Sequence, residues 1–198
     1  MTNLLTHSLL VLLLWSGSAI AQQQVSNARW VPYSANYTET VSIRGSSGSP
    51  TQNQTLSEEI RSDDGTLLTV VTVGGKKMSG KLWQASGQMF SIDYLSKRAV
   101  LTGKLPRRHP FTPPDASLGT KTIAGIQCTV YPLHTKNGNG TICVDMDNDL
   151  IASAETHTDS AGVHQDYVKQ LTSINLTSPI NNSTLQIPTG FTQLVPSR

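Results

Sequence analysis

The sequence predicts a mainly β protein, built as a curved antiparallel meander sheet with little helix, and three observations lead to this fold class. Apolar and polar residues alternate in short segments bounded by Gly, Pro, Asn and Asp, which is typical of strands joined by tight turns. Charged residues make up only 14% of the chain, against roughly 25% in ordinary soluble domains. No segment has a helical period long enough to form a stable helix alone.

The first residues predict an exported protein. A short polar start leads into the apolar run 9–15, and small residues follow that end in the A-x-A cleavage site Ala19-Ile20-Ala21. We therefore expect residues 1–21 to be a signal peptide cleaved after Ala21, and residues 22–198 to form a single antiparallel β domain in the bacterial periplasm or secreted. The apolar run is too short to cross a bilayer, so we expect no transmembrane span.

The first part of this domain is expected to be a series of hairpins. The turn signals are the stretch Gly45–Pro50, the pair Asp64-Gly65 and the pair Gly74-Gly75. The strands predicted between and after these turns are 34–44, 51–61, 66–73, 81–85, 88–94 and 98–102.

A proline-rich connector at about 105–118 then separates the two parts of the sheet. The strands predicted after the connector are 120–133, 140–146, 150–158 and 163–177. Helix is expected only as single turns, for which the candidates are 57–62, 92–99 and 181–186.

Cys128 and Cys143 are the only cysteines, and in an exported chain we expect them to form a disulfide. A tight turn at Asn137-Gly138 would not place them opposite each other, whereas a four-residue loop over 134–137 would. A disulfide that closes this loop should stabilise the fold by roughly 3 kcal/mol.

Positive charge is concentrated in the middle of the chain. Residues 65–114 carry eight cations and one acid, Asp93. One interpretation is a set of solvated strand faces and loops, and the other is a contact with an anionic envelope surface through Lys97, Arg98, Arg107 and Arg108. Nucleic acid is not expected as a partner, because no recognition motif or run of aromatic residues accompanies the charge.

Catalytic and metal motifs are weak. The stretch Gly45–Ser49 fails the nucleophile-elbow pattern, and the acidic stretch Asp145–Asp149 lacks the Gly and Glu of a calcium loop, so it is expected to be a turn. One register of the following hairpin would gather two histidines and two carboxylates on one face, whereas a three-residue loop would disperse them as ordinary polar residues. These weak metal candidates are Glu155, His157, His164 and Asp166. We assign no catalytic residue and no cofactor, and expect a protein that is not an enzyme.

A meander with one polar face must bury its other face, and a single sheet without strong helices can do so by curling. Curling should leave an apolar groove that binds a ligand. The bulky residues that we expect on this apolar ligand face are Leu68, Val70, Leu82, Met89, Phe90, Ile92, Val100 and Ile126.

The second part of the chain resembles secreted bacterial β-rich proteins of unknown function. The matching motifs are the segment from Leu118 to Cys128, with its Thr122-Ile123 and Gly125, and the tail from Pro179 to Phe191. These proteins are distantly similar to the Lol-type lipoprotein carriers of the bacterial periplasm. The resemblance implies a half-barrel, an unclosed curved sheet whose concave face takes acyl chains. This chain lacks the amphipathic helices that plug the barrel of the carriers.

Three hypotheses for function remain open. The first is a non-enzymatic envelope protein that binds an apolar or amphiphilic ligand, such as a lipid or a lipoprotein acyl chain, in its curved sheet. The second is a structural or interaction module that binds protein or cell-wall polymer. The third is a metal-dependent hydrolase.

Overall fold

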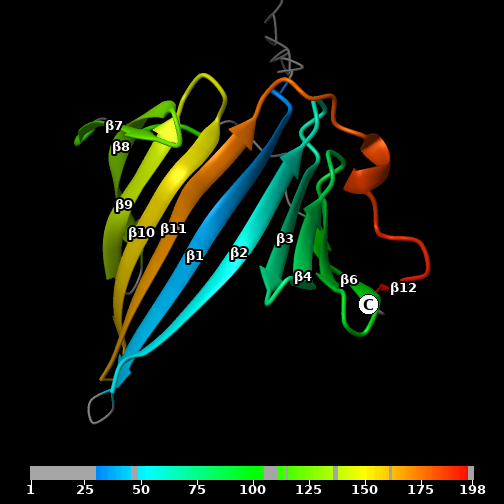
Figure 1. The fold of residues 1–198 in the computed structure, drawn as a ribbon, viewed down its shortest axis with the longest axis horizontal. Helices are drawn as coiled ribbons and strands as arrows, with labels where there is room; N and C mark the ends of the chain where they lie inside the picture. Colours follow the sequence, from blue (N-terminus) through cyan, green and yellow to red (C-terminus); the bar gives the residue numbers. More distant parts are fainter. Residues whose placement is uncertain are drawn as a thin grey trace, which may run out of the picture.

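The computed structural model describes residues 30–45, 49–104, 111–114, 116–135, 138–160 and 162–195. The predicted signal peptide lies outside the described residues, and the connector is described only in part. The described strands form one large curved sheet in the order β12-β6-β5-β4-β3-β2-β1-β11-β10-β9-β8-β7 (Figure 1). Each neighbouring pair is antiparallel except β12 and β6. The predicted fold class, a curved antiparallel meander sheet with little helix, is therefore confirmed.

The N-terminal half of the sheet follows the predicted hairpins. After β1 its strands are β2 (Thr51–Arg61), β3 (Leu67–Val73), β4 (Lys76–Trp83), β5 (Gln88–Asp93) and β6 (Arg98–Lys104). Strand β1 (Tyr33–Gly45) joins this half to the other, because it pairs with both β2 and β11. The helical turns suggested at 57–62 and 92–99 are wrong. Residues 57–61 lie in β2, which pairs on both sides, and residues 92–99 contain the end of β5, a turn over 94–97 and the start of β6.

The C-terminal half consists of β7 (Gly119–Ile123), β8 (Ile126–Thr135), β9 (Gly138–Asp145), β10 (Leu150–Ser160) and β11 (Val163–Asn175). The single strand expected at 120–133 is in fact a hairpin, because Ala124 and Gly125 both have positive φ angles, 49° and 81°, and reverse the chain. The short 3-10 helix η1 (Asn182–Leu185) matches the helical turn expected at 181–186. Strand β12 (Thr192–Leu194), which was not predicted, runs parallel to β6.

The side toward which the sheet curves can be inferred from a hollow of about 340 Å³. This hollow is lined by residues of six adjacent strands, β11, β1, β2, β3, β4 and β5. Strands in a sheet lie about 4.8 Å apart, so a flat sheet would spread these residues too widely to enclose one space. The sheet therefore curves toward the face that carries Glu39, Glu59 and Lys169. We call this the inner face and the opposite one the outer face.

The C-terminal half and β1 bury apolar residues on the inner face. The members of this inner cluster are Tyr33, Ala35, Tyr37, Cys128, Val130, Cys143, Leu150, Ala152 and Leu171. Ile123 and Ile126 of the β7–β8 hairpin pack against it, and β7 comes close to β11 although three strands lie between them in the sheet. This end of the sheet is thus rolled onto itself. On the opposite face of this half, Tyr131, Ile142 and Val144 form a smaller separate cluster that packs with Phe111 of the connector.

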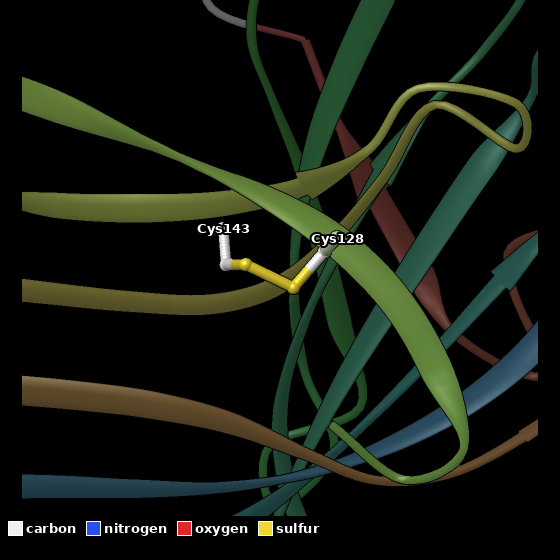
Figure 2. Close-up of a disulfide and its surroundings, with 2 residues drawn as sticks. All are labelled: Cys128 and Cys143. Carbon is white, nitrogen blue, oxygen red and sulfur yellow. A yellow bond between two sulfur atoms is a disulfide. The ribbon is translucent and has the colours of Figure 1, made fainter. Parts of the chain in front are cut away.

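The predicted disulfide between Cys128 of β8 and Cys143 of β9 is present (Figure 2). It lies inside the inner cluster. The expected direct opposition of the two cysteines is wrong. Thr129 pairs with Val144 and Val130 pairs with Cys143, so Cys128 reaches its partner diagonally. The cause is the shorter connection between the strands, since β8 continues to Thr135 and β9 begins at Gly138.

The N-terminal half buries its apolar residues on the outer face instead. This outer cluster comprises Leu68, Val70, Leu82, Phe90, Ile92, Ala99 and Leu185. The segment between β11 and β12, residues 176–191, supplies Leu185 and also packs Ile180, Ile187 and Phe191 against the cluster. We call this segment the strap; Figure 1 shows it crossing over to the N-terminal half and ending at β12. Phe191 meets Tyr94 edge to face at 5.6 Å.

Candidate functional site

The inner hollow, which extends from β11 across β1 and β2 to β5 of the N-terminal half, is a polar surface, although it lies on the concave side of a sheet. Its lining comprises Glu39, Glu59, Thr69, Val71, Ser79, Gly80, Lys81, Ser91, Tyr167 and Lys169. The strand registers place these residues in rows, since Glu59 pairs with Thr69, Thr69 with Lys81 and Lys81 with Ser91. Hydroxyl groups and charges therefore face the hollow from neighbouring strands.

Two carboxylates of the hollow are held by hydrogen bonds. Glu59 forms a short ion pair with Lys169, and both side chains are only 13% exposed. The Lys169 ammonium also lies 4.1 Å from the centre of the Tyr37 ring, and the Tyr33 hydroxyl donates to Glu59 Oε2 at 3.3 Å. These contacts fix the Glu59 carboxylate and the Lys169 ammonium in place.

The second carboxylate, Glu39, accepts hydrogen bonds from the Ser57 hydroxyl and, at 3.2 Å, from the Tyr167 hydroxyl. Burial raises the pKa of Tyr167 above its ordinary value, and the Glu39 carboxylate raises it further. Burial likewise raises the pKa of Tyr37, with the charge of Glu59 as the next cause. Both phenols therefore stay protonated at neutral pH, and Tyr167 remains a hydrogen-bond donor.

An apolar row lies beside the polar hollow on the same inner face. Leu67 pairs with Trp83, and Trp83 pairs with Met89, so the three side chains stand next to one another across β3, β4 and β5. All three are half-buried rather than enclosed. The inner face of the N-terminal half thus combines a polar hollow with an adjoining apolar row.

The residues predicted for an apolar ligand face are divided between the two faces. Leu68, Val70, Leu82, Phe90 and Ile92 belong to the outer cluster under the strap. Met89 and Val100 lie on the inner face, because Met89 pairs with Trp83 and Val100 pairs with Ser91. Ile126 packs against the inner cluster of the other half. The structure therefore does not bring the eight residues together into one groove.

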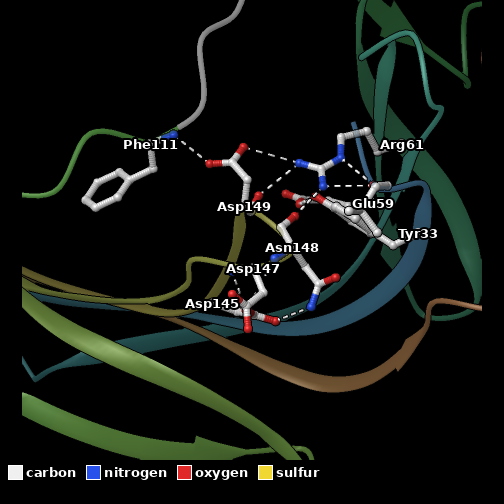
Figure 3. Close-up of polar contacts among 9 residues, drawn as sticks. Tyr33, Glu59, Arg61, Phe111, Asp145, Asp147, Asn148 and Asp149 are labelled. Carbon is white, nitrogen blue, oxygen red and sulfur yellow. Dashed lines mark hydrogen bonds and ion pairs between the residues drawn. The ribbon is translucent and has the colours of Figure 1, made fainter. Parts of the chain in front are cut away.

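Arg61 is a central residue that the sequence analysis missed. Its side chain is completely buried at the end of β2, and its guanidinium donates to the Val31 carbonyl from Nε at 3.0 Å and Nη2 at 2.9 Å (Figure 3). Nη1 donates to the Asp149 carbonyl at 2.9 Å and contacts Asp149 Oδ2 at 3.3 Å, and Nη2 also donates to the Asn148 carbonyl. The guanidinium lies over the rings of Trp30 and Tyr33, at 5.0 and 4.5 Å.

No local signal in the sequence marks Arg61, because it shares its side of β2 with the polar residues Ser57 and Glu59, and only the folded sheet turns that side inward. Its contacts join β2 to the β9–β10 turn and to the segment before β1, so Arg61 connects the two halves of the sheet. Because the guanidinium is enclosed and occupied by protein acceptors, we assign it a structural role.

The acidic stretch Asp145–Asp149 forms the β9–β10 turn, as expected. Asp145 Oδ1 accepts hydrogen bonds from the backbone N–H groups of Asp147 and Asn148, and Oδ2 accepts from the Asn148 side chain at 2.6 Å. Asp149 Oδ1 accepts from the Phe111 N–H at 2.6 Å, which ties the connector to the turn. The carboxylates are therefore used to shape the turn.

The weak metal candidates lie on the β10–β11 hairpin in a register that neither prediction anticipated. His157 pairs with Asp166 and Asp159 pairs with His164, while Glu155 pairs with Val168. The nearest contacts are His157 Nδ1 to Asp166 Oδ1 and His164 Nδ1 to Asp159 Oδ1, both 2.7 Å. Within the described residues, no group of three or more His, Cys, Asp or Glu side chains is arranged to hold a metal ion.

The basic residues predicted to contact an anionic surface are only partly described. Lys97, in the turn between β5 and β6, and Arg98, the first residue of β6, are both exposed. Arg107 and Arg108 lie outside the described residues. In the part of the chain that the structure describes, no helix is long and apolar enough to cross a membrane.

The sequence matches no family model and no curated protein sequence. Among solved structures, an uncharacterised conserved protein from Thermus thermophilus is similar, with 10% identity and a TM-score of 0.50 over 82% of this chain and 91% of that one. At this identity the likeness is one of fold alone.

Two further solved structures resemble the chain more loosely. In a Pseudomonas aeruginosa MucA/MucB complex the identity is 15% and the TM-score 0.45, over 76% of this chain and 55% of that chain. A LolA superfamily protein from Nitrosomonas europaea shares 11% identity at a TM-score of 0.35, over 81% and 93% of the two chains. A LolA superfamily protein is thus among the solved structures that this chain resembles, as the Lol-type resemblance of the sequence led us to expect.

Proposed function

We propose that this protein is an exported, non-enzymatic binding protein that holds an amphiphilic ligand, such as a lipid or a lipoprotein acyl chain with its polar end, on the inner face of its N-terminal half. The observation that carries this proposal is the position of the apolar row directly beside the polar hollow. The hollow, at about 340 Å³, falls in the size range of small-molecule sites, roughly 300–1,000 Å³.

The chemistry of the two surfaces supports a ligand with two unlike ends. Leu67, Trp83 and Met89 are half-buried, so an acyl chain laid on them would remove apolar surface from water at about 25 cal/mol per Å². In the hollow the charges of Glu59 and Lys169 are already fixed by protein contacts. Groups fixed in this way can recognise a polar headgroup without losing side-chain freedom. The disulfide supports an oxidising compartment such as the periplasm.

The test uses the two tryptophans that follow the predicted signal peptide, Trp30 and Trp83. A lysophospholipid brominated on its acyl chain, added below its micelle concentration, should quench the fluorescence of Trp83 but not that of Trp30, which lies under Arg61. Trp83→Phe should therefore abolish most of the quenching, whereas Trp30→Phe should preserve it.

A matched pair of methionine variants locates the site. Met89→Lys places a charge in the apolar row and should weaken lysophospholipid binding at least about tenfold. Met146→Lys, in the β9–β10 turn where Met146 is 42% exposed, should leave binding unchanged. Absence of any quenching, or equal weakening by both variants, would refute the proposal and favour the interaction module that binds protein or cell-wall polymer.

A further inference from the structure

Two neighbouring turns form one end of the N-terminal half, at the lower edge of its strands in Figure 1. They are the β3–β4 turn at Gly74-Gly75 and the β5–β6 turn over residues 94–97. Both turns lie at the same end because β4 is antiparallel to β3 and to β5. The Tyr94 N–H donates to the Met78 carbonyl at 3.1 Å, and the Lys77 ammonium lies 5.9 Å from the centre of the Tyr94 ring. The two turns therefore form a single surface.

This surface is strongly basic. Its four cations are all exposed: Lys97 lies in the β5–β6 turn, and the strands that follow the two turns begin with Lys76, Lys77 and Arg98. Two carboxylates lie near the cations: Glu58 lines a pocket together with Lys77 and Tyr94, and Asp93 accepts hydrogen bonds from the N–H groups of Leu95 and Ser96 and from the Ser96 hydroxyl. Hydrogen bonds from Ser96 are the main cause that lowers the pKa of Asp93. Asp93 is thus occupied in shaping its turn, and the surface keeps a net positive charge.

Each turn also carries an exposed apolar side chain next to the cations. Leu95 is 65% exposed in the β5–β6 turn, and Val73 is 45% exposed at the start of the β3–β4 turn. A single exposed apolar residue is ordinary on a soluble protein. Two of them at neighbouring turns, flanked by four cations, match the composition of surfaces that lie in the interface of an anionic bilayer.

We propose that these two basic turns dock on an anionic lipid bilayer, with Leu95 and Val73 entering the headgroup layer and the four cations contacting the lipid phosphates. Charge complementarity selects this partner, because the surface offers cations around two apolar side chains. Val71 and Ser79 of the inner hollow lie just inside the same turns. Docking therefore brings the hollow close to the membrane, although the proposal does not depend on what the hollow binds.

The test is flotation of the mature protein with vesicles of phosphatidylcholine alone or mixed with phosphatidylglycerol. We expect binding to the anionic vesicles only, and weaker binding as salt is raised. Each cation near an anionic surface contributes about 1 kcal/mol, so Lys97→Gln with Arg98→Gln should lower the partition coefficient about 30-fold. The matched double variant Arg44→Gln with Lys121→Gln removes two exposed cations elsewhere and should change it little.

A second matched pair tests the apolar contact. Leu95→Ser should lower the partition coefficient about tenfold. Leu118→Ser, which alters a side chain that is 62% exposed in the other half, should have no effect. Equal binding to neutral and anionic vesicles, or equal losses in the matched variants, would overturn the proposal. Quenching by brominated lysophospholipid that persists in Leu95→Ser would separate this surface from the ligand site.

Discussion

The two halves of this sheet bury their main apolar clusters on opposite faces. The C-terminal half and β1 bury most of their apolar residues on the inner face, where the sheet rolls onto itself around the disulfide. The N-terminal half buries them on the outer face, where the strap covers them. Because the strap covers the main apolar face of the N-terminal half, the concave face of this half can carry polar groups beside its short apolar row.

The change of face takes place around β1 and β2, and buried polar groups occupy this seam. Glu59 and Lys169 pair there, and Arg61 holds the β9–β10 turn against the end of β2. Such groups cost free energy to bury unless every one is partnered. The seam should therefore be the most sensitive part of the molecule, and each half should respond separately to changes in its own cluster.

The largest effect is expected at the seam. Arg61→Met leaves the Asp149 carboxylate and the Val31 carbonyl without their guanidinium donor, and should lower the free energy of unfolding by about 3–5 kcal/mol. Arg44→Met, at an exposed position, should change it by less than about 0.5 kcal/mol. Urea denaturation measures both. A loss below about 1 kcal/mol in Arg61→Met would show that the halves are held together without this residue.

The disulfide should support the C-terminal half. Replacing Cys128 and Cys143 by Ser should destabilise the protein by about 3 kcal/mol, because the unfolded chain regains the freedom of the loop between them. Amide hydrogen exchange should accelerate first in β8 and β9, while β4 and β5 keep their protection until global unfolding. Uniform acceleration across both halves would mean that the sheet opens only as one unit.

The strap should support the N-terminal half. Leu185 is 6% exposed in the outer cluster, and Leu185→Ala should cost about 2–3 kcal/mol. Leu194→Ala, at a side chain that is 42% exposed in β12, is the matched control and should cost little. Faster exchange is expected in β4 and β5 and not in β8. Faster exchange in β8 would contradict the separation of the two clusters.

The smallest effect is expected at the β10–β11 hairpin, away from both clusters. The hydrogen bond with Asp159 is the main cause that raises the pKa of His164 above 6.5, and the charge of Asp166 adds to it. Protonated His164 therefore stabilises the hairpin below this pH, and its contribution disappears as the pH rises through the raised pKa.

NMR titration should give His164 a pKa above 6.5, and Asp159→Asn should lower it. Signals of the two clusters should not shift with this titration. A pKa at or below 6.5 in the unmodified protein would show that the hydrogen bond does not form in solution.

Much of the fold could be predicted because strands carry a local signal. The alternation in 51–61 and the turns at Asp64-Gly65 and Gly74-Gly75 placed β2 and β3 closely. The hairpin at 124–125 was missed because the apolar residues continue across it, and only the positive φ angles of Ala124 and Gly125 reveal the turn. The pairing of Cys128 with Cys143 was predictable because the chain has no other cysteine.

The alternation along strands such as β5 follows from the sequence alone, whereas which side of a strand faces inward depends on how the whole sheet curves and on what covers it. Alternation has the same period on both faces of a sheet. The sequence is therefore equally compatible with Leu68 and Val70 lining a concave groove and with their lying under the strap, where the structure places them. Arg61 shows the same limit, because its acceptor at Asn148 lies 87 residues away in the chain. No local pattern encodes a contact between positions so far apart, and only the folded sheet brings them together.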